Sequence, residues 1–109
     1  MKTKENVNTK FTKTESSSIK NSKERLLFRA LLAQKNEQEM ADLLRDLLTL
    51  PEIEEFSNRL EIARQLREGH SYLNVAHKVG TSTTTVTRVA HWLFKGCGGY
   101  YRTLKKLIK

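Results

Sequence analysis

Two short apolar patterns separated by one glycine constrain this chain more than any other feature of its sequence. Both patterns have the spacing of an apolar helix face. Their members are Val75, Ala76 and Val79 before Gly80, and Val86, Val89 and Leu93 after it. Glycine accepts a positive φ at little steric cost, so the chain can turn sharply at Gly80. Residues 71–93 therefore predict two short helices, with the small Ala76 where the second helix crosses closely.

Two serines mark where these helices begin. Ser71 and Ser82 each precede one of the apolar patterns. A serine hydroxyl at such a position accepts a hydrogen bond from an N–H group of the first helical turn. The caps, the apolar phases and the glycine together predict a helix-turn-helix over about residues 71–93, with its second helix over residues 82–93.

If the apolar residues of the second helix face inward, its opposite side carries groups that suit the major groove of DNA. Threonine hydroxyls can bond base edges, and Arg88 can bind guanine O6 and N7 with two hydrogen bonds. The predicted base-reading residues are Ser82, Thr83, Thr84, Thr87, Arg88 and His91. The predicted phosphate contacts on the first helix are Ser71, Tyr72 and Lys78. The alternative interpretation is that the threonines form an ordinary solvated surface.

The charge distribution agrees with an anionic partner for this part of the chain. The 109 residues carry a formal net charge of +8. Residues 26–69 contain six basic and nine acidic residues, whereas residues 70–109 contain seven basic residues and no acidic one. Residues 1–22 are polar and cannot bury enough apolar surface to fold, so we predict a disordered basic tail there. This tail either touches phosphates or only keeps the protein soluble.

The remaining apolar patterns predict further helices. They cover residues 23–35, with Ser22 as N-cap, then 37–48 and 51–68, and a last short helix begins at Tyr100 with Leu104, Leu107 and Ile108 inward. The first two helices carry more leucine surface than a small helix-turn-helix core can cover, and soluble monomers rarely expose a large apolar patch. We therefore predict an all-α domain of about six helices over residues 23–109 that forms a homodimer.

The composition argues against several other classes of protein. No apolar run approaches the roughly 20 residues of a membrane span, and no apolar segment follows the basic N-terminus as in a secretory signal. We expect a cytoplasmic, nucleoid-associated protein. The single cysteine, Cys97, excludes an internal disulfide, and His70 and His77 are spaced too far apart to share a metal ion. We predict no catalytic site, no metal and no cofactor.

Several motifs, in order, resemble the tryptophan repressor superfamily, and within it the YerC/YecD group. They are Leu-Pro-Glu-Ile-Glu-Glu-Phe at 50–56, Asn-Arg-Leu-Glu-Ile-Ala at 58–63, Glu-Gly-His-Ser-Tyr at 68–72, Ser-Thr-Thr-Thr-Val-Thr-Arg-Val at 82–89 and Gly-Gly-Tyr at 98–100. The resemblance covers about residues 30–109. It implies an all-α, intertwined homodimer and a helix-turn-helix transcriptional regulator.

The resemblance also implies where a ligand would lie. The tryptophan repressor holds its co-repressor between two arginines, which match Arg59 and Arg88. Small glycine and serine residues of the family correspond to Val89 and Trp92 in this chain. A valine and an indole would fill this former ligand pocket. We therefore expect Trp92 to pack as a core residue and free tryptophan not to bind.

These observations predict a sequence-specific regulator of transcription that binds double-stranded DNA as a homodimer. It would act as a repressor, read the major groove with residues 82–93, and need no tryptophan as co-repressor. The alternative is a nucleic-acid-binding module or an adaptor of the transcription machinery that is not a repressor.

Overall fold

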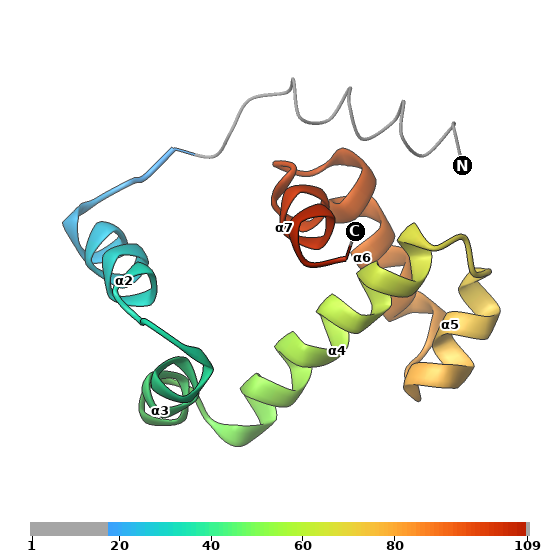
Figure 1. The fold of residues 1–109 in the computed structure, drawn as a ribbon. Coiled ribbons are helices and arrows are strands. Elements are labelled where there is room, and N and C mark those ends of the chain that lie inside the picture. Colours follow the sequence, from blue (N-terminus) through green and yellow to red (C-terminus); the bar gives the residue numbers. More distant parts are fainter. Residues whose placement is uncertain (1–17, 109) are drawn as a thin grey trace. The chain divides into compact units, whose positions relative to one another are not determined.

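The computed structural model describes residues 18–108, and all its regular elements in that range are α-helices (Figure 1). In chain order they are α2 (Ser22–Leu32), α3 (Glu37–Leu47), α4 (Leu50–Arg67), α5 (Tyr72–Val79), α6 (Thr83–Lys95) and α7 (Gly99–Leu107). The prediction of an all-α fold with about six helices is confirmed for this range. Residues 1–17, which hold most of the predicted tail, lie outside it.

Side-chain caps fix the start of the first two described helices. The side chain of Asn21 accepts a hydrogen bond of 2.9 Å from the backbone N–H of Glu24 and caps α2. The prediction of Ser22 as this cap is wrong, because Ser22 is already the first helical residue. Asn36 caps α3 in the same way, by accepting a 2.9 Å hydrogen bond from the backbone N–H of Glu39. Asparagine serves here because its short side-chain oxygen reaches the second or third N–H of the helix.

The chain divides into two compact units, which we describe separately. One contains α2, α3 and the first turns of α4, up to Phe56, and the other runs from Ser57 onward. That residues 23–109 form one DNA-binding domain stays a prediction.

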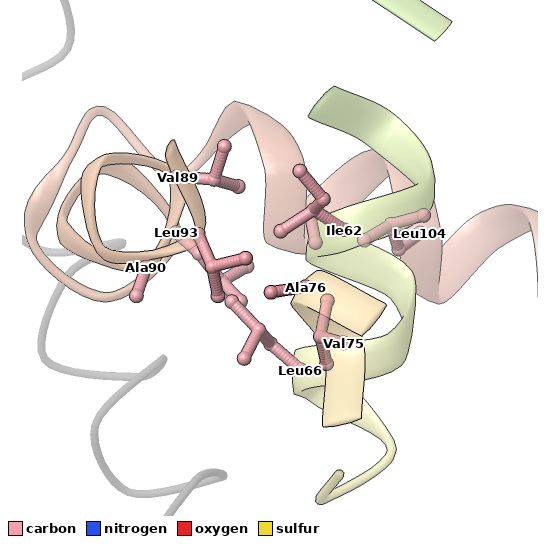
Figure 2. Close-up of a cluster of buried hydrophobic side chains, with 10 residues drawn as sticks. Ile62, Leu66, Val75, Ala76, Val89, Ala90, Leu93 and Leu104 are labelled. Atoms are coloured by element: carbon pink, nitrogen blue, oxygen red, sulfur yellow. The ribbon is translucent and has the colours of Figure 1, made fainter. Parts of the chain in front are cut away.

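The second unit has a continuous apolar core (Figure 2). Four helices contribute buried side chains to it, because each has apolar residues on one face at helical spacing. The contributors are Ile62, Ala63 and Leu66 of α4, Val75 and Ala76 of α5, Val86, Val89, Ala90 and Leu93 of α6, and Leu104 of α7. Helix α6 packs against both α5 and α7, so its apolar side is held in the core.

The first unit has no such core. Neither α2 nor α3 contains a buried residue. Leu26 is 69% exposed and Leu32 is 83% exposed, although both are large apolar side chains. The apolar faces of these two helices are therefore only partly covered in the single chain, since Leu31, Met40, Leu43 and Leu44 are no more than half-buried.

Helix α7 is oriented differently from the prediction. Tyr101 and Leu104 are buried, whereas Leu107 is 74% exposed and Ile108 is half-buried. Tyr101, Leu104 and Ile108 share one face at i, i+3 and i+7, and Leu107 lies about 90° away from the middle of that face. The prediction that Leu107 points inward is wrong for this reason. None of the described helices is both long enough and apolar enough to cross a membrane.

Candidate nucleic-acid interface

Helix α5 and the turn after it have the predicted geometry. Ser71 caps α5, since its hydroxyl accepts a 3.1 Å hydrogen bond from the backbone N–H of Asn74. Gly80 ends the helix in the left-handed region, with φ of 81°. This turn lets the N–H groups of Gly80 and Thr81 both donate to the carbonyl of Ala76, at 2.9 Å each. These two backbone hydrogen bonds cap the C-terminus of α5, as in common glycine caps.

Helix α6 follows after two further residues and is held by its inner face. Ser82 caps it by accepting a 3.1 Å hydrogen bond from the backbone N–H of Thr85. Val86, Val89 and Leu93 are buried, as the apolar spacing predicted. Ala90 is buried on the same face. A helix anchored on one side in this way presents the other side to solvent in a fixed orientation.

The predicted base-reading residues all lie on exposed positions of α6 and its cap. They are Ser82, Thr83, Thr84, Thr87, Arg88 and His91. Along α6, Thr83 and Thr87 are one turn apart, and His91 lies one turn further. Thr84 and Arg88 form a neighbouring row with the same spacing. The structure thus brings these side chains together on one surface of a single helix, which we call the α6 outer face.

Two hydroxyls of this face, those of Ser82 and Thr87, are already hydrogen-bonded to groups of α6. The hydroxyl of Thr87 donates to the carbonyl of Thr83 at 2.9 Å. Because the hydroxyl proton is used in this bond, Thr87 can offer a partner only an acceptor. The Ser82 oxygen caps the helix and lies 3.2 Å from the hydroxyl oxygen of Thr85. Ser82 therefore has less hydrogen-bonding capacity left for a base than the sequence interpretation assumed.

The predicted phosphate contacts lie on and just before α5. Ser71, Tyr72 and Lys78 are all exposed. Tyr72 is 43% exposed, so its phenol is accessible at the first turn of the helix. The Ser71 oxygen, by contrast, is used in capping.

The acidic side chain nearest in sequence to this surface forms an ion pair with an arginine and also lies near a histidine. Glu68 lies 2.7 Å from Arg64 and 3.5 Å from His70. Arg64 also binds both carboxylate oxygens of Glu61, at 3.0 and 2.6 Å. Hydrogen bonds from Arg64 and Gln65 lower the pKa of Glu61 from 4.5 to about 2. Because Glu61 and Glu68 are both paired with Arg64, neither carboxylate is free to offset the positive charge of residues 70–108.

The residues of the expected former ligand pocket have different environments. Val89 is 3% exposed and belongs to the core. Arg59 and Arg88 are exposed. Trp92 is 58% exposed, so the expectation that its indole packs in the core is wrong for the single chain. The reason is rotational, because Trp92 lies on the side of α6 between the buried row and the outer face.

One cluster of an aromatic ring and two cations in the second unit is not predicted from the sequence. The ring of Tyr101, itself 6% exposed, lies under two cations from different helices. The guanidinium carbon of Arg67 is 5.4 Å from the ring centroid, and the ammonium of Lys105 is 5.7 Å away. Such cation–π contacts hold long basic side chains in place. Lys105 lies one turn after Tyr101 on α7, whereas the contact of Arg67 depends on the tertiary arrangement of α4 and α7.

Comparison with known proteins identifies the family. The family model described as Trp repressor protein matches residues 22–108. The chain belongs to the Trp repressor family. It is also 37% identical over 81 residues to the uncharacterized protein YerC of Bacillus subtilis (strain 168), covering 74% of this chain and 78% of that protein. The resemblance drawn from the sequence motifs is thereby confirmed.

Solved structures of Trp repressor relatives agree with this assignment. A TrpR-like protein from Eubacterium eligens ATCC 27750 is 39% identical with a TM-score of 0.79, covering 82% of this chain and 92% of that one. A candidate Trp repressor from Staphylococcus aureus is 31% identical with a TM-score of 0.77, covering 81% and 88%. The Trp repressor family consists of DNA-binding regulators rather than enzymes. Among the described residues, no group of three or more His, Cys, Asp or Glu side chains could hold a metal ion.

Proposed function

We propose that this member of the Trp repressor family is a homodimeric, sequence-specific transcriptional repressor that reads the major groove with the α6 outer face. The observation that carries this proposal is the arrangement of α6. One side of the helix is buried in a four-helix core, and the other side exposes threonines, Arg88 and His91. No acidic residue follows position 69 to repel phosphates.

The chemistry of the outer face suits base edges. Arg88 can donate two hydrogen bonds to guanine O6 and N7. Thr87, which donates its own proton to the helix backbone, can accept from the exocyclic amine of adenine or cytosine. In helix-turn-helix proteins, N-terminal residues of the recognition helix contact base edges in the major groove. Tyr72 and Lys78 on α5 would then contact the neighbouring phosphates and fix the orientation of the helix.

The incompletely covered apolar faces of α2 and α3 support the homodimer. Because α2 and α3 bury no residue in the single chain, a second copy would remove their leucines from water. A two-fold dimer also presents two reading helices at the spacing of successive major grooves, about 34 Å. The DNA partner in turn favours a cytoplasmic, nucleoid-associated location.

Selection of binding sites from random duplex DNA tests the proposal directly. We expect recovered sites to contain two related half-sites, and binding to them to survive excess competitor DNA. Binding that depends on charge alone would instead disappear with added salt. That outcome would favour the alternative, a nucleic-acid module or adaptor without operator specificity.

Two matched variants separate base reading from charge. Arg88→Ala should lose about 1–3 kcal/mol of preference for the selected site over competitor DNA, because it removes a contact to a base edge. Lys105→Ala removes one exposed positive charge on α7 and should weaken all sequences alike. Competition binding at fixed salt measures both. Unchanged specificity in Arg88→Ala would contradict the assignment of the α6 outer face.

We further propose that DNA binding needs no free tryptophan. Val89 fills space in the core where the family has a smaller residue, and an indole side chain at position 92 takes the place of a small one. Titration calorimetry with L-tryptophan should give no binding heat, and the selected site should bind equally well with and without this amino acid. Micromolar tryptophan binding would refute this part of the proposal.

A further inference from the structure

Helix α7 carries a row of positive side chains on its solvent side. Its nine residues include three basic residues and no acidic one. These three, Arg102, Lys105 and Lys106, are all exposed. They are three and four residues apart, so they lie next to one another on one side of the helix. The buried residues Tyr101 and Leu104 lie on another side, which faces the core.

A fourth cation joins this row from α4. The Tyr101 ring lies 5.4 Å from the guanidinium carbon of Arg67 and 5.7 Å from the ammonium of Lys105, both measured to the ring centroid. The two charges are therefore no more than about 11 Å apart. The negative face of an aromatic ring attracts cations, so the buried ring holds two like charges near each other. We call Arg67, Arg102, Lys105 and Lys106 the α7 basic face.

The protein does not neutralise the α7 basic face itself. None of its four cations forms an ion pair with a carboxylate of residues 18–108. Glu68, the neighbour of Arg67 in sequence, is bound to Arg64 instead. Arg102 donates a 3.4 Å hydrogen bond to the carbonyl of Cys97, which carries no charge. A group of like charges without an internal partner attracts an external polyanion.

The α7 basic face is separate from the α6 outer face. Leu104 of α7 belongs to the same apolar cluster as Val89 and Leu93 of α6 (Figure 2). Because both helices turn their apolar sides to this cluster, their polar sides leave it in different directions. Helix α7 also follows the C-terminal end of α6 at Lys95, about 18 Å along the helix from Thr83, whereas base reading uses N-terminal residues. A straight duplex read by α6 therefore leaves the α7 basic face to another partner.

We propose that the α7 basic face binds the phosphate backbone of a second DNA duplex, so that one dimer holds two DNA segments together. This inference rests on the proposed function, since the first duplex is the one read by the α6 outer face. Duplex DNA carries one negative charge per about 1.7 Å of its axis, so four clustered cations meet several phosphates. Such contacts carry no sequence information, so the second duplex is bound without regard to its sequence.

The composition of the α7 basic face favours a nucleic-acid backbone over a protein partner. The centre of a protein–protein interface is depleted in charged residues and enriched in aromatic ones. Here the exposed groups are cations, and the one aromatic ring among them, that of Tyr101, is buried beneath them at 6% exposure. An acidic protein surface is therefore the alternative that the experiment has to separate.

Capture of a second duplex tests the inference. Beads carry the selected-site duplex, are saturated with protein and washed, and then receive a fluorescent duplex of unrelated sequence. We expect the fluorescent duplex to be retained on the beads together with the protein. Protein retained without the fluorescent duplex would overturn the inference and leave the proposed function intact. Failure of the protein to bind the selected-site duplex would instead contradict the proposed function.

A matched pair of variants assigns the second duplex to the α7 basic face. Arg102→Gln combined with Lys106→Gln should lower the salt dependence of second-duplex binding, the slope of log K against log salt concentration, by about two. The control, Lys20→Gln combined with Lys35→Gln, removes two exposed positive charges elsewhere and should keep the parent slope. Any long-range effect of lost charge is shared by the two variants. Equal slopes in parent, variant and control would overturn the assignment.

Competition with poly-L-glutamate separates the acidic-protein alternative. If the α7 basic face binds a phosphate backbone, unlabelled duplex should displace the fluorescent duplex at a lower concentration of negative charge than poly-L-glutamate needs. The reverse order would overturn the inference in favour of an acidic protein partner.

Discussion

Glu61 and Arg64 are a pair of residues whose contact makes stability depend on pH. Arg64 binds both oxygens of the Glu61 carboxylate, and the hydrogen bonds from Arg64 and Gln65 lower the pKa of Glu61 from 4.5 to about 2. A carboxylate with a depressed pKa in the folded state stabilises the fold above its ordinary pKa. That contribution is lost as the pH falls from about 4.5 toward 2.

We therefore expect the free energy of unfolding to decrease over this acidic range, and to decrease less in Glu61→Gln. The side chains of Glu61 and Arg64 are 41% and 38% exposed, so solvent screening limits the difference to about 0.5–1 kcal/mol. Urea unfolding at a series of pH values between about 2 and 6 measures it. Identical acid profiles of the two proteins would mean that this pair contributes nothing to stability.

At the scale of elements, the turn between α5 and α6 depends on one backbone conformation. Gly80 has a φ of 81°, and a Cβ built there meets no atom within 4 Å. Replacement by alanine thus adds no clash with neighbouring groups, but it places a Cβ in the left-handed region. We expect Gly80→Ala to destabilise the fold by about 1–2 kcal/mol.

Gly99 provides the matched control for this prediction. A Cβ there also meets no atom within 4 Å, and Gly99 is not among the glycines with positive φ. Gly99→Ala should be neutral or stabilising by about 0.4–1 kcal/mol, because alanine restricts the unfolded chain. Urea midpoints of the two variants compare directly. Equal destabilisation by both would contradict the importance of the Gly80 conformation.

At the scale of the whole molecule, the exposed leucines of α2 and α3 predict that two copies of the chain associate. Leu32 of α2 is 83% exposed, and we predict that a second copy covers it. Leu32→Asp should weaken dimerisation at least about tenfold, or 1.4 kcal/mol, because a charge would enter an apolar contact. Sedimentation equilibrium measures the change. Leu73→Asp on α5, a similarly exposed leucine, should dimerise as the parent does.

Much of the second unit could be predicted from the sequence because its signals are local. Ser71, Gly80 and Ser82 act through hydrogen bonds and φ values within a few residues, and all three behave as predicted. The buried residues Val86, Val89 and Leu93 follow from the helical repeat. The exposed outer face of α6 follows from the same repeat, since burying one side of a helix leaves the other side to solvent.

The errors concern residues whose environment depends on contacts between distant segments. Trp92 was expected in the core, yet it lies between the buried and exposed sides of α6 and is mostly exposed. The sequence pattern predicts Leu107 inward and places Tyr101 only at the start of the helix, but the packing of α7 buries Tyr101 and leaves Leu107 exposed. Periodicity alone does not fix which side of a short helix is buried. Successive residues are about 100° apart around the helix axis, so including or omitting one residue turns the predicted buried side by a large angle.

The sequence by itself thus determined the helices of this protein, the turn at Gly80, the acid-free charge of its last part and its membership of the Trp repressor family. These depend on local propensity, spacing and composition, which the order of residues contains. Only the tertiary structure decided which side of α7 is covered, that Trp92 stays mostly exposed, that Arg67 of α4 lies over the Tyr101 ring, and which leucines stay in water. Those outcomes depend on how four helix faces share one core, and burial is a property of that whole arrangement.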